Sequence, residues 1–220
     1  MIQKGVNLSA LFAEKLAQNY DKWYKTSYGR YADKLEKQLF LKLVDFKKGQ
    51  SLLDVGCGTG HFSFWFHDLG FKVVGMDIST EMLKVARSKI KSEKIRFIQA
   101  DACSFPFPDN SFDVVTLITV LEFLSEPQKA LREAFRVSRE KIFLGVLGKW
   151  SFLAFRRKLK ALFKESTYRR AKFYSVRELR KLLRGCVSAD EDDIEIRSEK
   201  TLRGAFIGLA IIKKRKRSGG

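Results

Sequence analysis

Residues 51–60 read Ser-Leu-Leu-Asp-Val-Gly-Cys-Gly-Thr-Gly, a short apolar run followed by glycines at positions 56, 58 and 60. An apolar run of this length that ends in glycines predicts a buried parallel strand entering a tight turn. Glycine lets the backbone turn sharply and approach a ligand without a Cβ atom in the way. A helix predicted from His61 adds free N–H groups and a positive dipole end at the same place. The stretch therefore predicts a strand–turn–helix unit that binds a ligand.

Strand and helix patterns alternate on the C-terminal side of this unit. Strands are predicted at residues 71–77, 95–100, 112–119 and 141–147, and helices at 61–69, 79–91 and 125–138. Ser79 is a favoured N-cap, and Ser125-Glu-Pro-Gln128 combines a capping box with a proline in the first turn. Prolines keep residues 101–111 out of helix and central strand. Four βα units closed by a fifth strand favour a parallel sheet with right-handed crossovers and helices on both faces.

Further elements are predicted at both ends of the chain. Apolar spacing predicts two helices within residues 8–44, joined by an aromatic stretch at Tyr20–Tyr31. The later elements are a basic amphipathic helix at 150–163, a helix at 176–184 opened by a Ser175-x-x-Glu178 box, and antiparallel strands at 194–202 and 205–212. The expected fold is α/β, with a doubly wound, mostly parallel, seven-stranded Rossmann-like sheet, a final antiparallel hairpin and an N-terminal helical cap.

One domain over residues 1–212 suits a chain of 220 residues. Its expected parts are a helical cap (1–47), a cofactor-binding core (48–148), a basic lid segment (149–185) and C-terminal strands (186–212), followed by a basic tail (213–220). The longest late apolar run, Gly204–Ile212, is too short to cross a bilayer. The charged N-terminus does not resemble a secretory signal, so we expect a cytoplasmic protein.

Cysteine and histidine spacing argues against disulfides and against a metal site. Cys57, Cys103 and Cys186 form an odd set without a C-x-x-C motif, so free thiols are expected. His61 and His67 have no ligand partner at zinc spacing and are expected to be ordinary helix residues.

Three aspartates follow or end the predicted strands. Asp54 lies in the first strand, Asp77 stands 19 residues after Gly58, and Asp101 follows the third strand. Ligands of open α/β sheets bind at the carboxyl ends of strands, and an acid at about this spacing binds ribose hydroxyls. A nicotinamide loop would show G-x-G-x-x-G, whereas here the third glycine comes one residue early. A buried acid before the loop also favours a ligand that carries an ammonium or sulfonium group.

These motifs resemble the class I S-adenosylmethionine-dependent methyltransferases, in particular the small-molecule branch of the ubiquinone and menaquinone biosynthesis methyltransferases. The matching residues are Leu52-Leu-Asp-Val-Gly-Cys-Gly-Thr-Gly60, Val74-Gly-Met-Asp77-Ile-Ser-Thr-Glu-Met82-Leu, Asp101-Ala, and Phe105-Pro-Phe-Pro-Asp-Asn-Ser-Phe-Asp113-Val-Val, within about residues 45–148. The resemblance implies S-adenosylmethionine as cofactor. It implies that Asp54 and the loop of Gly56, Cys57, Gly58 and Gly60 bind the methionine part, and that Asp77 binds the ribose. It places the adenine among Ile78, Met82, Asp101 and Ala102. The methionine amino group would lie near Ile118, and Tyr20 of the cap would be a further contact.

The sequence departs from the family pattern in two places. Residues 138–141 replace a Lys-Pro-Gly-Gly-like turn, which leaves the cofactor assignment intact. Phe123 stands where similar proteins often carry histidine, so a histidine-assisted mechanism there is not expected. In-line positioning of the methyl donor is the enzyme's principal expected task. If the acceptor must lose a proton, Glu122 is the first choice of base, although a solvated or helix-capping acid fits its position equally well.

The acceptor is left open by the sequence. Tyr24, Tyr28 and Arg30 are candidates for lining its pocket, while core packing also explains the tyrosines. Residues 149–185 hold 13 lysines and arginines against two glutamates, out of a net charge of +18. This segment fits a lid with a solvated basic face, a surface for an anionic acceptor or membrane, or an RNA-binding surface. A small-molecule methyltransferase and an RNA methyltransferase or RNA-binding module therefore both stay open.

Overall fold

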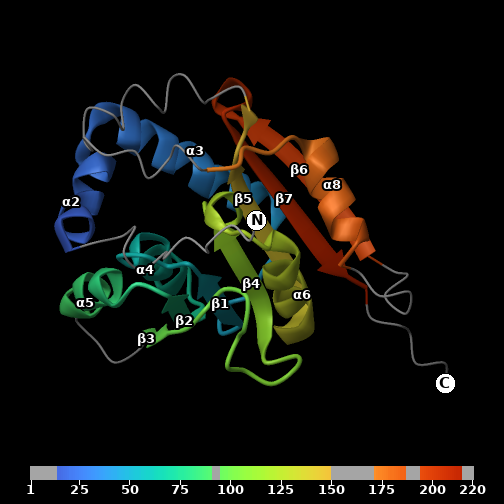
Figure 1. Cartoon of the computed structure of the whole chain (residues 1–220), viewed down its shortest axis with the longest axis horizontal. Coiled ribbons are helices and arrows are strands. Elements are labelled where there is room, and N and C mark those ends of the chain that lie inside the picture. Colours follow the sequence, from blue (N-terminus) through green and yellow to red (C-terminus); the bar gives the residue numbers. More distant parts are fainter. Residues whose placement is uncertain (1–13, 91–94, 150–170, 187–193, 215–220) are drawn as a thin grey trace, which may run out of the picture.

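A computed structural model describes residues 14–90, 95–149, 171–186 and 194–214 (Figure 1). Its centre is a seven-stranded sheet with the order β3-β2-β1-β4-β5-β7-β6. The strands are β1 (Ser51–Val55), β2 (Lys72–Asp77), β3 (Ile95–Gln99), β4 (Phe112–Ile118), β5 (Ser138–Leu147), β6 (Ile194–Thr201) and β7 (Phe206–Lys213). The first five strands pair in parallel, whereas β7 pairs antiparallel with both β5 and β6. The expected fold class is confirmed.

Helices cover both faces of the sheet. They are α2 (Glu14–Lys25), α3 (Ser27–Leu43), α4 (His61–Asp68), α5 (Thr80–Ser88), α6 (Pro127–Val137) and α8 (Val176–Arg184), with short 3-10 turns η1 (Leu121–Phe123) and η4 (Leu202–Gly204). Buried residues of α3, α4 and α5 form one apolar core with one side of the sheet, and those of α6 and α8 form a second core with the other side. The two cores give the strands β1, β4 and β5 fully buried positions, as the apolar runs in the sequence predict.

Two details of the predicted βα pattern are wrong. Residues 100–111 between β3 and β4 form a loop, as the prolines predict, so only three of the four expected βα units contain a helix. The predicted capping box at Ser125 does not form, because the N-cap of α6 is Glu126, which makes no side-chain cap hydrogen bond. Pro127 at the first helical position starts this helix instead, since its fixed φ suits a first turn. The box at Ser175 does form, with Glu178 bonding back.

The C-terminal hairpin turns through backbone of positive φ. Leu202 and Arg203 have φ values of 54° and 55°, and Gly204 has 83°. The turn joins β6 to β7, which pairs with β5, and the carbonyl of Gly204 would lie 2.0 Å from a Cβ atom added at Gly148. A side chain larger than hydrogen therefore does not fit at Gly148, the residue that follows β5.

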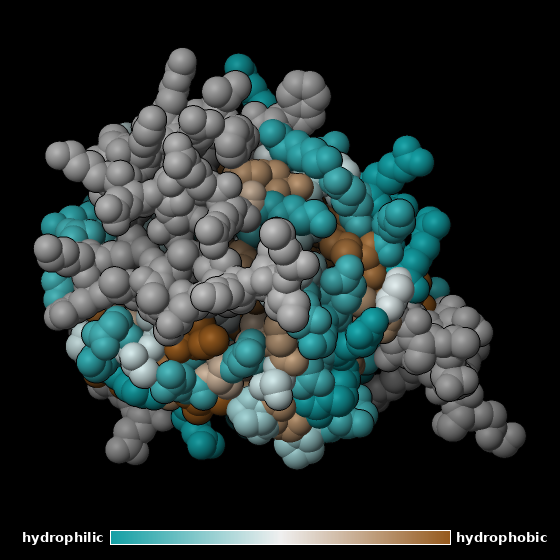
Figure 2. Space-filling model, in the orientation of Figure 1, coloured by the Kyte–Doolittle hydropathy of each residue, from teal (hydrophilic) through white to brown (hydrophobic). Residues whose placement is uncertain are grey.

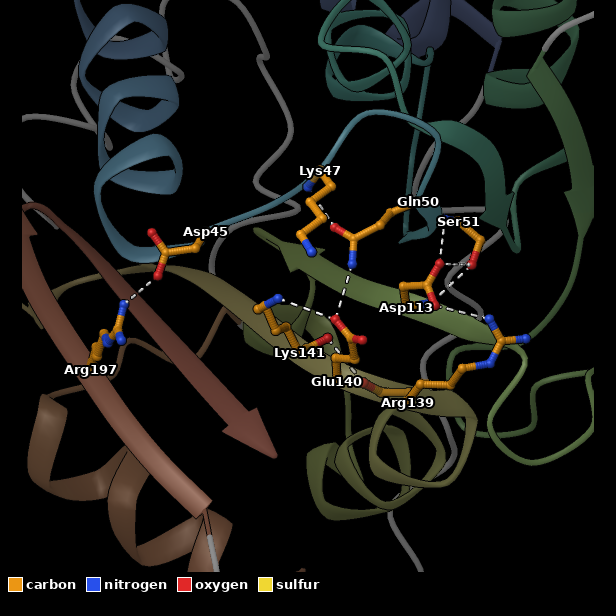
Figure 3. A network of polar contacts seen from close by, with 10 residues as sticks. Asp45, Lys47, Gln50, Ser51, Asp113, Arg139, Glu140, Lys141 and Arg197 are labelled. Atoms are coloured by element: carbon orange, nitrogen blue, oxygen red, sulfur yellow. Dashed lines mark hydrogen bonds and ion pairs between the residues drawn. The ribbon is translucent and has the colours of Figure 1, made fainter. Parts of the chain in front are cut away.

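The amino ends of the central strands carry a polar network (Figure 3). Asp113 of β4 accepts hydrogen bonds from the backbone N–H and hydroxyl of Ser51, at 2.7 and 2.8 Å, and pairs with Arg139 at 2.9 Å. Gln50 donates to Glu140 at 3.0 Å. These bonds hold the starts of β1, β4 and β5 in register at the end of the sheet opposite the glycine loop.

Several expectations concern residues that lie outside the described ranges. The basic helix predicted at 150–163 and the tail from 215 are among them. Figure 2 shows hydrophilic side chains over α6 and α8, where Arg177, Arg180, Lys181 and Arg184 are exposed. Within the described ranges, no helix has both the length and the apolar character that a membrane span requires.

Candidate active site at the carboxyl ends of the strands

The glycine loop after β1 has a backbone that other residues adopt with difficulty. Gly56, Gly58 and Gly60 have φ values of 67°, 54° and 81°. A Cβ atom at Gly56 would lie 2.4 Å from Val120, and one at Gly60 would lie 2.9 Å from Phe97. A Cβ atom at Gly58 would meet nothing within 4 Å. The first and third glycines therefore permit close packing of protein atoms, whereas the middle glycine faces open space that a ligand can approach.

Asp54 lies behind this loop and is 2% exposed. Its carboxylate accepts hydrogen bonds from the hydroxyls of Ser63, at 2.6 Å, and Thr116, at 3.0 Å. Burial raises its pKa to about 6, and these two bonds oppose the rise. Both partners of Asp54 are therefore hydroxyl groups, whereas the sequence predicted cationic or N–H partners. The sequence contained an indication of these partners, because Ser63 is a polar residue in the aromatic helix α4 and Thr116 is a polar residue in the apolar strand β4.

Asp77 at the end of β2 connects two backbone segments. One carboxylate oxygen accepts from the N–H of Gly58 at 2.8 Å, and the other accepts from the N–H of Ser79 at 2.9 Å. Burial raises the pKa of Asp77, while these N–H groups lower it. Each oxygen keeps a further lone pair, so the carboxylate can accept hydrogen bonds from a vicinal diol while it holds the loop.

A cavity opens beside Asp77 at the ends of the parallel strands. It is lined by Gly56, Met76, Asp77, Ile78, Ala100, Asp101, Ala102, Thr119, Val120, Phe123 and Leu124. Five of the predicted cofactor-binding residues are brought together here, namely Gly56, Asp77, Ile78, Asp101 and Ala102. The cavity offers two carboxylates among small and apolar side chains, which suits a flat ring that also carries polar groups.

Thr119, Val120, Phe123 and Leu124 were missed as cavity residues by the sequence reasoning. Thr119 has φ 57°, and its N–H donates to the carbonyl of Gly145 at 2.7 Å. Non-glycine residues in this region store backbone strain and are frequent at functional sites. Their position directly after β4 was the available signal, since ligands bind where parallel strands end.

The other predicted cofactor contacts do not line this cavity. Cys57 is a buried residue of the glycine loop, and its N–H donates to the carbonyl of Met76 at 3.0 Å. Met82 is 2% exposed in the first turn of α5, and Ile118 packs in the core on the α3 side of the sheet. Gly60 is the N-cap of α4. Whether these residues touch the cofactor stays a prediction.

The cap helix α2 contacts the back of the glycine loop. The hydroxyl of Thr59 donates to Asp21 at 2.6 Å, Asp21 forms an ion pair with Lys89 of α5, and the Lys89 ammonium donates to the carbonyl of Thr59 at 2.9 Å. Tyr20, the residue before Asp21, has its pKa raised to about 12, mainly by burial, with the charges of Glu36 and Asp77 adding to the rise. Asp21 of α2, Thr59 of the loop and Lys89, the C-cap of α5, therefore form one polar clamp, which we call the Asp21 clamp. Figure 1 shows α2 beside α5.

Glu122 in η1 is neither solvated nor a helix cap. Its side chain is 1% exposed, and one carboxyl oxygen accepts the N–H of Leu147 at 2.6 Å. The other oxygen has no hydrogen-bond partner in the described part of the chain. Burial raises its pKa to about 7. Both of the alternatives that its sequence position suggested are wrong, and its use as a base stays a prediction.

A second cavity, which we call the cap cavity, lies between the cap and the end of β5. It is lined by Trp23, Tyr28, Ala32, Glu36, Leu147, Leu202, Ala205 and Phe206. Of the candidate acceptor residues, Tyr28 lies here, Tyr24 stacks on His61 with ring centroids 3.6 Å apart, and Arg30 is exposed and donates to the carbonyl of Lys25. Arg30 therefore does not line this cavity. Sequence reasoning missed Glu36, although it continues the buried stripe of Gly29, Ala32 and Leu39 on α3.

Fold and site together are those of a Rossmann-like α/β protein, and comparisons identify the family. A family model described as a methyltransferase domain matches residues 53–143. A demethylmenaquinone methyltransferase of Renibacterium salmoninarum is 44% identical over 47% of this chain and 43% of its own length. A Methanocaldococcus jannaschii protein described as uncharacterized is 35% identical over 78% of both chains. A SAM-dependent methyltransferase structure from Thermotoga maritima has a TM-score of 0.72 at 24% identity, covering 93% of this chain and 99% of that one.

The chain belongs to the class I S-adenosylmethionine-dependent methyltransferases. This confirms the family that the strand-end motifs resemble. The chain spans less than half the length of the Renibacterium methyltransferase.

Proposed function

We propose that this protein transfers a methyl group from S-adenosylmethionine to a small-molecule acceptor. The observation that carries the proposal is the cavity at the carboxyl ends of β1 to β4, where Asp77 holds the N–H of Gly58 and lies beside Asp101. Demethylmenaquinone methyltransferases among the relatives support a small acceptor, since their names state a small-molecule substrate.

The residues present fit the expected cofactor. The open space over Gly58 would receive the methionine part, and the Asp77 carboxylate would accept from the ribose hydroxyls. Ile78 and Ala102 would lie against the adenine, with Asp101 accepting from its exocyclic amine. When bound, the cofactor supplies a methyl group on a sulfonium, whose thioether is a good leaving group.

The protein's own contribution is positioning and exclusion of water. The Asp21 clamp holds the cap helix against the loop, and the apolar side chains of Val120, Phe123 and Leu124 cover one side of the cavity. Alignment of the acceptor with the methyl group can lower the barrier by several kcal/mol, on the order of 7 or more in well-oriented systems. Glu122, with a pKa of about 7, is able to accept a proton from the acceptor near neutral pH.

A labelled-methyl experiment tests the proposal. The protein is incubated with methyl-labelled S-adenosylmethionine and a cell extract that is separated into small-molecule, RNA and protein fractions. We expect label in the small-molecule fraction, and its loss with Asp77→Ala. Label confined to RNA, or equal labelling by the variant, would contradict the proposal.

A further inference from the structure

The cap cavity contains an acid that forms no ion pair with any described residue. Glu36 of α3 lines it together with the aromatic rings of Trp23, Tyr28 and Phe206. The described residues give Glu36 neither a hydrogen bond nor an ion pair, and no lysine or arginine is among the lining residues. Burial raises its pKa to about 8; the neighbouring charge of Asp33 adds to the rise, and the charge of Lys37 opposes it.

Near the same cavity lies a second acid, one of whose carboxyl oxygens has no partner among the described residues. Glu122 is hydrogen-bonded to the N–H of Leu147, whose side chain lines the cap cavity, and its free oxygen is buried. Glu36 and Glu122 are close enough for the charge of one to raise the pKa of the other. Phe123, the next residue after Glu122, lines the cofactor cavity. Glu122 itself lines neither cavity, but its sequence neighbour Phe123 lines one and its hydrogen-bond partner Leu147 lines the other.

Two cations near these acids, both among the described residues, contact other groups. Lys37 pairs with Asp33 at 2.8 Å, and the ammonium of Lys172 lies over the Tyr174 ring at 5.5 Å from its centroid. The hydroxyl of Tyr174, close to Glu122, donates to the carbonyl of Leu121 at 3.1 Å. A buried carboxyl oxygen without a partner costs free energy, and a donor that arrives with a ligand would remove this cost.

We propose that the acceptor is an amine, received in the cap cavity with its nitrogen between Glu36 and Glu122. This inference rests on the proposed function and adds the substrate class. Carboxylates accept hydrogen bonds from ammonium or amine N–H groups, and aromatic faces attract cations. At neutral pH the raised pKa values leave both acids partly or largely protonated; an ammonium would favour their ionised forms, whereas an anionic acceptor would oppose ionisation.

The transfer step balances with these residues. An ammonium group first gives a proton to one carboxylate, which frees the nitrogen lone pair. The lone pair forms the N–C bond to the methyl carbon as the C–S bond breaks, with its electron pair left on sulfur. The product nitrogen is a methylated ammonium, and it leaves with its positive charge or passes a proton to the second carboxylate. Acids with pKa values near 7 and 8 can exchange protons at neutral pH.

Calorimetry with paired probes tests the inference. Protein saturated with S-adenosylhomocysteine is titrated with benzylamine and butylamine, each compared with its alcohol and its carboxylate counterpart. At least one amine should bind about tenfold or more tighter than its counterparts, and Glu36→Gln and Glu122→Gln should each remove most of this preference. Glu140→Gln, at the opposite end of the strands, is the matched control and should leave the preference unchanged.

The outcomes separate this inference from the proposed function. Equal affinity for amines, alcohols and carboxylates, or a preference that survives in Glu36→Gln, would overturn the amine assignment. S-adenosylhomocysteine affinity is measured for every variant and shows that each remains folded; if Glu122→Gln does not fold, Glu36→Gln decides the result. If the wild-type protein does not bind S-adenosylhomocysteine, the proposed function and this inference both fail. If it binds and only the amine preference is missing, this inference alone fails.

Discussion

At the scale of single residues, the three glycines of one loop have different tasks. Gly56 makes room for Val120, and Gly58 leaves open space, although both have positive φ. An alanine at either position costs about 1 kcal/mol or more for its left-handed backbone. The space around the two residues therefore separates packing from ligand binding.

Alanine substitutions test this separation. Gly56→Ala should lower the melting temperature more than Gly58→Ala, because its Cβ atom would overlap Val120 at 2.4 Å. Gly58→Ala should weaken S-adenosylhomocysteine binding by about tenfold or more, since its Cβ atom would enter the ligand's space. Thermal melts and calorimetry on both variants measure the two effects. Equal losses of stability and of affinity in the two variants would contradict this assignment.

The buried acid Glu122 predicts a pH dependence of stability. Its pKa in the folded protein is about 7, above that of the unfolded chain, so the folded state retains a proton that the unfolded chain releases. The resulting stability is complete below pH about 4.5 and is lost as the pH rises through about 7. Glu122→Gln should therefore gain stability relative to wild type between pH about 5 and 8, by up to about 3 kcal/mol. Denaturant unfolding at several pH values measures this, and a difference that stays constant with pH would refute it.

Sequence reasoning at this scale succeeds where a residue follows a strand and fails where its partners come from distant segments. Asp77 and Asp101 were found because chain position alone brings strand ends to one edge of the sheet. The hydroxyl partners of Asp54 come from α4 and β4, and the partner of Glu122 is the backbone of β5. Such pairings depend on strand order and register, which local spacing does not determine.

At the scale of elements, α2 is held to the core through the Asp21 clamp. Asp21→Asn should remove its ion pair with Lys89 and weaken the bond to Thr59. Exposed ion pairs contribute about 0–1 kcal/mol, so the melting temperature should change little. The dissociation rate of S-adenosylhomocysteine should rise severalfold, because the cap opens more readily. Stopped-flow measurements test this, with Asp68→Asn on α4 as the control, and an unchanged rate would argue against the clamp.

Local signals predicted most elements and missed two features of their connections. The N-cap Ser79 and the capping box of Ser175 both form as expected, because each depends on residues within four positions. Ser125 fails as a cap because Glu126 precedes Pro127 as the last non-helical residue. The connection from β3 to β4 is the loop that the two prolines in 101–111 predict, so the count of four βα units, which needs a helix there, is wrong.

At the scale of the whole molecule, the carboxyl ends of the parallel strands form the functional end of the sheet. The polar network of Asp113, Arg139 and Glu140 occupies the amino ends, whereas both cavities lie near the carboxyl ends of β1 to β5. The chain's net charge of +18 favours approach of anionic molecules at long range, while Glu36 and Glu122 make the cap cavity locally acidic. The net charge of the chain therefore favours anionic partners at long range, whereas the two acids favour a cationic group in the cap cavity.

Binding of S-adenosylhomocysteine to the wild-type protein and to Asp77→Ala tests the central claim most directly. Calorimetry should give saturable one-site binding to the wild type and a loss of affinity of about tenfold or more in the variant, since the ribose contact and the bond to Gly58 both disappear. NADH at equal concentration should not bind. No binding of S-adenosylhomocysteine, or equal binding by Asp77→Ala, would contradict a cofactor site at the end of β2.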